Sequence, residues 1–320
     1  MADGTSTTAN AGQKLPERAV RRPGRLDRPH YVFRPLSLLR SRVRPRAGRT
    51  KLPWGLELRY GTTGPMGSSL ERTGVYDLAM TETIFRLVRD GDTALDGGAN
   101  VGYVTSLMAC RAAPSGTVIA FEPQPEVFAR LRDNVHDWEA SGTPLARIEL
   151  RQVALSSSAG ERVLNVPGDR DANHERASLR EFKAAPADRI PVQAVRLDDV
   201  ERPAGPVRVL KLDTERHEHE VLLGAERLLG EVLHVILEHH EVPPSPVSEL
   251  LVEQGFELYT VHEGFAGPKL AELDANAPHV GWGPPNMIGT RDAGGLRSAF
   301  AAHGWQSLSP RLLGRRHPAG

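Results

Sequence analysis

The sequence predicts an α/β fold in which helices cover both faces of a doubly wound, mostly parallel sheet. From about Lys51 onward, short apolar runs alternate with amphipathic segments, a pattern typical of right-handed βαβ units. One apolar run also ends in "DGGANVG" and leads directly into a helix-like segment, as ligand loops of open parallel sheets do. With 320 residues, 39% of them hydrophobic, the chain is long enough for one large domain or two small ones.

Residues 1–50 form a basic leader that we expect to be mostly disordered. Segment 14–51 holds 13 lysines and arginines against Glu17 and Asp27, a local net charge of +11, although 40 basic and 40 acidic residues balance over the whole chain. An arginine-rich tail without a partner is the favoured interpretation. A basic surface for a membrane or nucleic acid is the alternative.

Composition excludes several other classes of protein. The N-terminus lacks the apolar core of a signal peptide, and no apolar run approaches the roughly 20 residues that span a bilayer. We therefore expect a cytoplasmic protein. Cys110 is the only cysteine, which excludes an intrachain disulfide and a cysteine-rich zinc site.

The individual elements follow in order. Segment 51–91 is predicted to form an N-terminal hairpin and then a helix from about Met80 to Arg89, which Asp90 and Gly91 end. The next part of the chain alternates regularly. It predicts strands at 93–97, 116–123 and 147–155, and helices at 102–112 and 125–138.

Residues 156–197 interrupt this alternation. Two strand-like runs flank a polar stretch there, so we expect an antiparallel insertion or a loop. The alternation then resumes, with strands at 207–213, 233–240, 257–262 and 286–291 and helices at 218–230 and 246–256. We assign residues 51–291 to one domain and residues 292–320 to a C-terminal tail.

The loop "DGGANVG" at residues 96–102 is the first candidate binding site. In an open parallel sheet, ligands bind beyond the carboxyl ends of the strands. Gly98 and Gly102 allow the backbone to approach a ligand closely. The helix that begins near Val101 offers unpaired N–H groups and a positive dipole end.

Three ligands compete for this loop. A phosphate-binding P-loop requires Lys followed by Ser or Thr after the last glycine, and neither follows Gly102. A dinucleotide loop requires a glycine where the chain has Ala99, and Asp96 would repel a pyrophosphate. S-adenosylmethionine carries a cationic sulfonium and amino group beside a carboxylate, so an acid at the strand end and a helix N-terminus both suit it.

Glu122 supports the S-adenosylmethionine hypothesis. It ends the next predicted strand, 26 residues after Asp96. A carboxylate in this place can accept hydrogen bonds from both hydroxyls of a ribose. A solvated acid at a strand end is the alternative when Glu122 is considered alone.

The chain resembles the FkbM family of methyltransferases in several consecutive blocks. These blocks are "VYDLAMTETIFRLVRDGDTALDGGANVGYVTSLMA", "GTVIAFEPQPEVFARLRDNV", "VALSSSAGE", "VRVLKLDTERHEHEVLLGAERLL", "VILEHH" and "NMIGT". The resemblance covers residues 51–291. It implies a Rossmann-like class I methyltransferase fold with a seven-stranded sheet, and S-adenosylmethionine-dependent methylation, usually of oxygen.

The resemblance also assigns cofactor-binding residues. It matches Asp96, Gly98, Asn100 and Gly102 to the cofactor loop and Glu122 to the ribose-binding acid. It further implies that residues from Ala154 to Ser156 border the adenine.

Two hypotheses concern the reacting end of the site. In the first, Asp213 or His217 is the general base for an acceptor hydroxyl, and Lys211, on the same strand face as Asp213, orients its carboxylate. In the second, Asp213, Glu215 and Glu238, alone or with a histidine, hold Mg²⁺ or Mn²⁺, which binds a diol acceptor. Solvated side chains are the alternative for the histidines His219, His239 and His240.

The sequence departs from the family pattern at Arg216, where the family usually has glycine. Arginine adopts the positive φ values open to glycine only at a cost, so we expect the acceptor side to differ from that of relatives. An aromatic wall over the acceptor is a further hypothesis, and its candidates are Trp54, Tyr60, Tyr76 and Trp282.

The function predicted from the sequence is an O-methyltransferase that uses S-adenosylmethionine. Its acceptor is predicted to be a hydroxyl of a small molecule or glycan, in secondary metabolism or polysaccharide modification. A non-catalytic scaffold that retains the fold is the alternative. Nucleic-acid methylation ranks low, because the arginines gather in the leader and the core lacks a basic stripe with aromatics.

Overall fold

The computed structural model describes residues 48–61, 65–166, 177–180, 188–238, 243–264, 266–273 and 286–308. Most of the predicted basic leader lies outside this part of the chain, as do His239, His240 and Trp282. The leader's last residues belong to the first strand, β1 (Arg49–Lys51).

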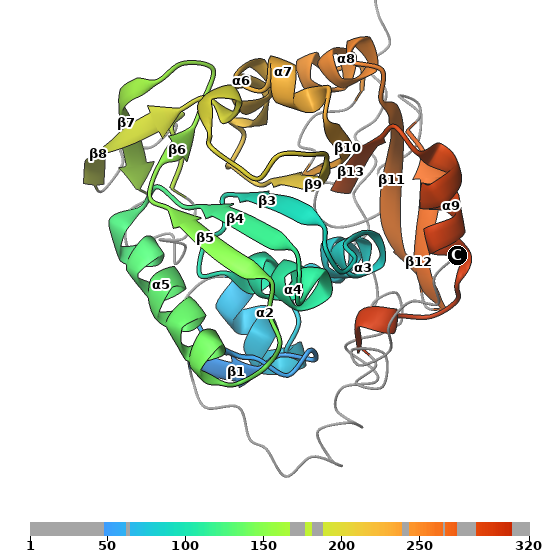
Figure 1. The fold of residues 1–320 in the computed structure, drawn as a ribbon, viewed down its shortest axis with the longest axis horizontal. Coiled ribbons are helices and arrows are strands. Elements are labelled where there is room, and N and C mark those ends of the chain that lie inside the picture. The colour runs from blue at the N-terminus through green and yellow to red at the C-terminus, as the bar shows by residue number, and fades with distance from the viewer. Residues whose placement is uncertain are drawn as a thin grey trace, which may run out of the picture.

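Within these described ranges, the central sheet has eight strands in the order β12-β11-β13-β10-β9-β3-β4-β5 (Figure 1). The strands from β10 to β5 are parallel to one another, whereas β13 and β12 run antiparallel to their neighbours. This topology confirms the predicted doubly wound, mostly parallel α/β class. Strand β12 is an eighth, edge strand beyond the seven that the resemblance implies. The bounds are β3 (Thr93–Gly97), β4 (Thr117–Phe121), β5 (Arg147–Arg151), β9 (Val207–Leu212), β10 (Val232–Glu238), β11 (Glu257–Gly264), β12 (Gly267–Glu272) and β13 (Asn286–Thr290).

Helices cover both faces of the sheet (Figure 1). Because successive strand residues point to opposite faces, the strands supply two separate cores: Ala94 belongs to one and Leu95 to the other. No helix in the described ranges is long and apolar enough to cross a membrane. The first face carries α3 (Leu78–Leu87), α4 (Tyr103–Ala112) and α5 (Pro125–Ala140), and the second carries α6 (Glu218–Leu223), α7 (Glu226–Leu229) and α8 (Pro246–Glu253).

The N-terminal segment packs beneath α4. It consists of β1, its antiparallel partner β2 (Glu57–Arg59), and α2 (Pro65–Thr73), a helix the sequence did not predict. The Trp54 indole donates a hydrogen bond to Ser106 Oγ at 3.0 Å and packs edge-on against Tyr103. Trp54 and Tyr60 are both buried in the core. They were therefore wrong candidates for an aromatic wall over the acceptor.

A small second sheet, in the order β6-β8-β7, occupies the region after β5. Its strands are β6 (Ala154–Leu155), β7 (Gly160–Val166) and β8 (Asp188–Val195), and β7 pairs antiparallel with β8. The single strand expected at 147–155 is thus two strands, since the chain leaves the central sheet after Arg151. This change of sheet places Ala154 beside the carboxyl edge of the central sheet.

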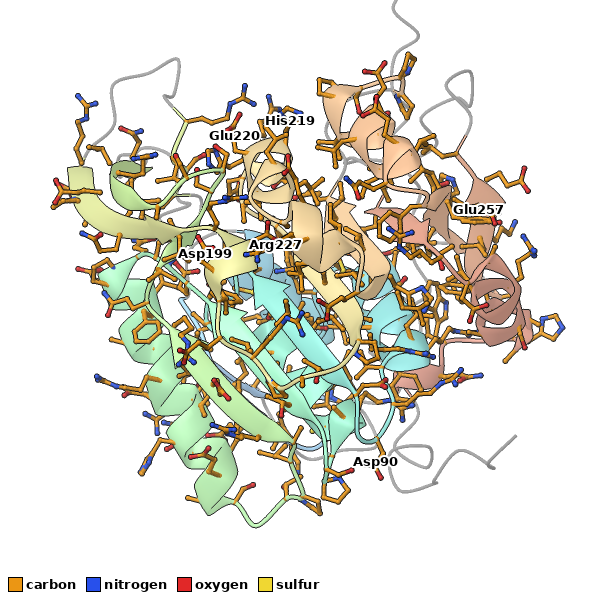
Figure 2. The ribbon with its side chains drawn as sticks, turned by 45° about the horizontal axis from the view of Figure 1, so that its top comes forward. Asp90, Asp199, His219, Glu220, Arg227 and Glu257 are labelled. Carbon is orange, nitrogen blue, oxygen red and sulfur yellow. The ribbon has the colours of Figure 1, made fainter. Side chains whose placement is uncertain are left out.

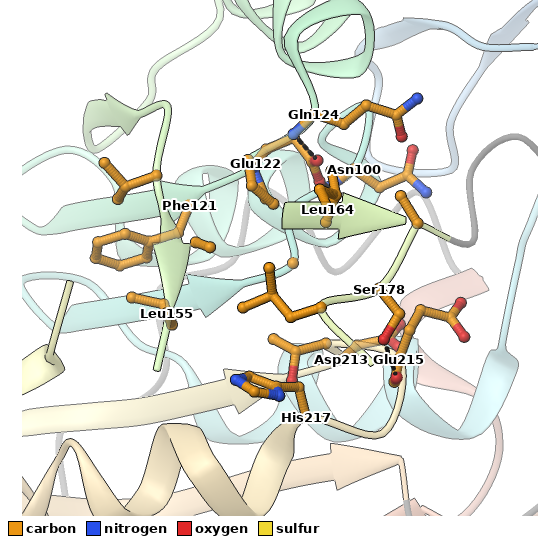
Figure 3. Close-up of a pocket in the computed structure, with 17 residues that line it drawn as sticks. Asn100, Phe121, Glu122, Gln124, Leu155, Leu164, Ser178, Asp213, Glu215 and His217 are labelled. Atoms are coloured by element: carbon orange, nitrogen blue, oxygen red, sulfur yellow. Dashed lines mark hydrogen bonds between the residues drawn. The ribbon is translucent and has the colours of Figure 1, made fainter. Parts of the chain in front are cut away.

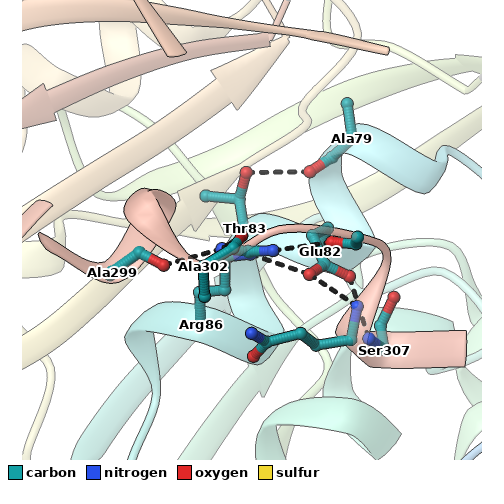
Figure 4. Close-up of polar contacts among 9 residues, drawn as sticks. Ala79, Glu82, Thr83, Arg86, Ala299, Ala302 and Ser307 are labelled. Atoms are coloured by element: carbon teal, nitrogen blue, oxygen red, sulfur yellow. Dashed lines mark hydrogen bonds and ion pairs between the residues drawn. The ribbon is translucent and has the colours of Figure 1, made fainter. Parts of the chain in front are cut away.

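The C-terminal segment is fixed to α3 by a buried ion pair (Figure 4). Arg86 Nε lies 2.7 Å from Glu82 Oε1, and both side chains are almost fully buried. The guanidinium donates to the carbonyls of Ala299, Ala302 and Gly304, and the carboxylate accepts the backbone N–H groups of Gln306 and Ser307. Residues 293–308, which include α9 (Ala293–Ala301) and η3 (Gln306–Leu308), are therefore part of the domain. The expectation of a tail from residue 292 onward was wrong for the part that the structure describes.

We predict that Arg86→Met lowers the free energy of unfolding by about 3–5 kcal/mol, because it leaves the Glu82 carboxylate buried without a partner. Urea denaturation measures this loss. Arg132→Met, at the exposed Arg132–Asp133 pair on α5, is the matched control and should change stability by less than about 1 kcal/mol. Equal effects of the two substitutions would contradict this account.

Candidate active site

A buried ion pair lies beneath the loop that follows β3. Asp96 and Lys211 are register partners on β3 and β9, and Lys211 Nζ lies 3.0 Å from Asp96 Oδ1. The ammonium also donates to the carbonyl of Gly98 at 2.9 Å, and Thr105 donates to Asp96 Oδ2 at 2.6 Å. Burial opposes the charge on Lys211, but the carboxylates of Asp96 and Asp213 outweigh it and raise its pKa.

This pair changes the roles expected for two residues. Lys211 was expected to orient Asp213, but the ion pair that it forms is with Asp96. Asp96 is fully buried and is not among the residues that line the adjoining pocket. Both side chains hold the loop from beneath.

The loop itself requires a glycine at position 98. Gly98 has a φ of +73°, and a Cβ there would lie 1.9 Å from the carbonyl oxygen of Asp213. Gly102 serves a different purpose from the expected one. With a φ of +94°, a Cβ on it would strike Leu131 and Trp138, so this glycine allows α4 to pack against α5 rather than a ligand to approach.

Glu122 follows β4 and lines the pocket. One carboxylate oxygen accepts the N–H of Asn100 and the other accepts the N–H of Gln124, both at 2.9 Å. Burial raises the pKa of Glu122 to about 7, although these two hydrogen bonds oppose the shift. Each oxygen keeps a further lone pair, so an ionised Glu122 can also accept two hydroxyl hydrogens.

The pocket lies between the central sheet and the small sheet, with an empty volume of about 650 Å³ (Figure 3). Its walls combine the β3 loop, the end of β4, and the residues after β9. On the apolar side, the small sheet contributes Ala154, Leu155 and Leu164, and the 177–179 segment, bridged to β7 through Ser178, contributes Ala177 and Leu179. Leu164 and the 177–179 segment were missed from the sequence, because nothing in residues 156–197 indicated what they fold against.

These residues fit S-adenosylmethionine. The paired acceptor positions of Glu122 suit a ribose diol, and the apolar side from the small sheet suits an adenine. Gly98 lines the pocket as well, and a methionine group would lie beside its backbone. Because Asn100 also lines the pocket, four of the six cofactor residues expected from the resemblance lie there: Gly98, Asn100, Glu122 and Ala154.

The segment after β9 forms the other end of the pocket, where Asp213, Glu215 and His217 line it (Figure 3). The His217 ring nitrogen Nε2 lies 3.1 Å from Ser156 Oγ, and burial lowers the pKa of this imidazole. His217 is therefore neutral near pH 7 and can accept a proton. Ser178 reaches across from the insertion and donates to the carbonyl of Glu215 at 2.8 Å.

Arg216 keeps a glycine-like backbone despite its side chain. Its φ is +71°, and that of Glu215 is +51°. The Glu218 carboxylate supports this turn by accepting the N–H groups of Thr214 and Arg216. The backbone turn is thus retained, and the arginine in place of the family's glycine changes only the side chain that projects from the turn.

The structure does not support the predicted metal site. Within the part of the chain that the structure describes, no three His, Cys, Asp or Glu side chains lie together in a way that could hold a metal ion. Asp213, Glu215 and Glu238 belong to this part and do not form such a group, so the Mg²⁺ or Mn²⁺ site predicted on them finds no support among the described residues.

A second cavity adjoins the first and shares His217 with it. It lies between the N-terminal ends of α6 and α8, and Arg216, Glu238 and Ser245 are among its lining residues. Figure 2 shows His219 and Glu220 on α6 on the side of the molecule away from Asp90, which precedes β3. The second cavity therefore lies at the carboxyl edge of the sheet, where an acceptor would have to lie.

Comparison with known proteins identifies relatives of the chain. Residues 96–258, just over half of the chain, match the family described as "Methyltransferase FkbM domain". The hexuronic acid methyltransferase AglP of Haloferax volcanii is 30% identical over 232 residues, which cover 69% of this chain and 89% of that protein. The 31-O-demethyl-FK506 methyltransferase FkbM of Streptomyces tacrolimicus is 31% identical over 219 residues, covering 59% and 82%. The crystal structure of a methyltransferase FkbM from Methylobacillus flagellatus KT aligns with a TM-score of 0.39 at 14% identity, over 71% of this chain and 48% of that one.

We predict that Gly98→Ala destabilises the protein more than Gly142→Ala, although the two glycines have almost the same φ, +73° and +72°. A Cβ at Gly142 meets nothing within 4 Å, so only backbone strain of about 1–2 kcal/mol applies there. At Gly98 the clash with Asp213 should add about 1–3 kcal/mol. Urea denaturation of both variants tests the difference. Equal losses would show that the close approach of the β3 and β9 loops contributes nothing.

Proposed function

The chain belongs to the FkbM family of S-adenosylmethionine-dependent methyltransferases, and from this premise we propose that it methylates a hydroxyl oxygen of a glycan or small molecule. The observation that carries the proposal is the pocket at the carboxyl edge of the sheet. In it, Glu122 offers two acceptor positions beside the glycine loop, and Asp213 and His217 lie at the other end. The names of two relatives, which act on hexuronic acid and on 31-O-demethyl-FK506, support an oxygen acceptor.

The proposed mechanism requires little covalent chemistry from the protein. S-adenosylmethionine supplies a methyl carbon already activated by the sulfonium. Glu122 would hold the ribose of the cofactor, and the pair Asp96–Lys211 holds the loop after β3 in place. We propose that the hydroxyl donates to Asp213 as it attacks, with His217 as the alternative base, because both line the pocket.

Calorimetric titration with S-adenosylhomocysteine tests the cofactor site. At pH 8 we expect micromolar affinity in the wild-type protein and a loss of tenfold or more in Glu122→Gln, equivalent to about 1.4 kcal/mol. Because the pKa of Glu122 is about 7 before binding, its carboxylate is mostly ionised at pH 8 and mostly protonated at pH 6. The wild-type affinity should therefore fall roughly tenfold between pH 8 and pH 6.

Glu122→Gln is also the control for this pH dependence, since an amide does not titrate in this range. Its affinity should be nearly the same at both pH values. Failure of the folded wild-type protein to bind S-adenosylhomocysteine would contradict the proposed function and favour a scaffold that retains the fold. Binding that Glu122→Gln leaves unchanged would place the ribose elsewhere.

A further inference from the structure

The second cavity, between the N-terminal ends of α6 and α8, has no part in the proposed cofactor site, yet it adjoins that site. The two cavities share His217. Arg216 lines the second cavity, and its two neighbours in the chain, Glu215 and His217, line the cofactor pocket. A molecule bound beside Arg216 would therefore lie next to the wall of the pocket in which the reactive methyl group would be held.

Two arginines line the second cavity, and hydrogen bonds join the segments that carry them. Arg180 follows the bridge to β7, and Arg216 lies in the turn after β9. Arg180 Nη1 donates to the carbonyl oxygen of Arg216 at 3.1 Å. Two residues before Arg180, the Ser178 hydroxyl donates to the carbonyl of Glu215 at 2.8 Å (Figure 3). The fold thus brings together two positive charges that are 36 positions apart in the sequence.

Both guanidinium groups keep N–H donors for a ligand. A guanidinium has five such donors. Among the residues that the structure describes, Arg180 uses one of its donors and the Arg216 side chain uses none. Arg216 also has a φ of +71°, at which a side chain costs free energy that glycine would avoid. A strained residue whose side chain stabilises nothing around it indicates a role in function.

Three carboxyl groups line the same cavity. Hydrogen bonds from the protein engage two of them: Glu218 accepts the N–H of Arg216, and Glu220 accepts the hydroxyl of Ser157 at 2.7 Å. Burial and the carboxylates around it raise the pKa of the third, Glu238, to about 8. The two guanidinium groups are therefore the charges in this cavity that remain for a ligand, and they favour an anion.

We propose that the second cavity binds the acceptor, and that Arg216, with Arg180 beside it, holds an anionic group of that acceptor, a carboxylate or a phosphate. This inference rests on the proposed function and narrows it to an acidic acceptor. The guanidinium fork suits both anions, because two of its N–H groups can donate in parallel to two oxygens of the ligand. An anion held there would place the rest of the acceptor beside His217, which lines both cavities.

The charge of Arg180 also connects the second cavity to the reacting end of the cofactor pocket. Burial is the main cause that lowers the pKa of His217, and the positive charge of Arg180 lowers it further, whereas Glu220 opposes the shift. An anionic group bound to Arg180 would offset this positive charge. His217 would then accept a proton more readily when an acidic acceptor is in place than when the cavity holds a neutral molecule.

Binding of matched charged and neutral sugars tests the inference without a known acceptor. The full chain, saturated with S-adenosylhomocysteine, is titrated with glucuronate and with its methyl ester, and separately with glucose 6-phosphate and with glucose. Ligand-detected NMR measures the affinities. We expect the anionic member of at least one pair to bind about tenfold more tightly than its neutral counterpart, equivalent to about 1.4 kcal/mol. The first pair tests a carboxylate and the second a phosphate, so the comparison also identifies the anion.

Arg216→Gly removes the guanidinium and suits the backbone, since glycine adopts a φ of +71° without strain. Binding of S-adenosylhomocysteine shows that this variant is folded. It should bind the preferred anionic sugar about tenfold more weakly than the wild-type protein and bind the neutral counterpart equally well. The matched control is Arg132→Gln on α5, because Arg132 is exposed and lines neither cavity. The control should keep the full preference for the anionic sugar.

Two results would overturn the inference: no tighter binding of the anionic member in either pair, including no binding at all, or a preference that Arg216→Gly leaves intact. An equal loss of the preference in Arg132→Gln would show a general effect of surface charge and would overturn it too. Failure of the wild-type protein to bind S-adenosylhomocysteine would instead contradict the proposed function.

Discussion

The buried ion pair between Asp96 and Lys211 is the interaction on which the site depends. It joins β3 to β9 at the edge where every proposed functional residue lies, and the same ammonium holds the carbonyl of Gly98. A buried charge without a partner is strongly destabilising, so neither residue can be removed alone at low cost. Lys211 also offsets part of the negative charge at this edge, because it acts on Asp213 and Glu122 as well as on Asp96. The ammonium of Lys211 thus influences both the geometry of the loop after β3 and the ionisation of the carboxyl groups around it.

Much of the fold could be predicted from the sequence, because its signals are local. The strand at residues 93–97 was correct to the residue, and the alternation of apolar runs with amphipathic segments was enough to predict the doubly wound sheet. Glu122 was found because a strand, an acid and Pro123 follow one another directly. Its place in the pocket follows from parallel topology, since the carboxyl ends of β3 and β4 meet at one edge.

The features that were missed depend on contacts between distant parts of the chain. Lys211 was assigned to Asp213 by alternation within one strand, whereas the pairing of β3 with β9 makes Asp96 its partner. Gly102, like Gly98, is a glycine in the loop after a strand, so the sequence predicted the same role for both. Gly102 instead packs against Trp138, which lies on a helix that begins 23 residues later. The hydrogen bond of Trp54 to Ser106 likewise joins residues about 50 positions apart, and that of Arg86 to Gly304 joins residues about 220 positions apart. Local patterns contain no information on such partners.

A double-mutant cycle on Asp96→Asn and Lys211→Met tests the central role of the ion pair most directly. Unfolding in urea and the affinity for S-adenosylhomocysteine would be measured for both single variants and the double variant. The account predicts that Lys211→Met lowers the free energy of unfolding by about 3–5 kcal/mol. The loss in the double variant should be smaller than the sum of the two single losses, by at least about 2 kcal/mol. Each folded single variant should bind S-adenosylhomocysteine at least tenfold more weakly than the wild-type protein. Additive losses within about 0.5 kcal/mol, with cofactor affinity unchanged, would contradict it.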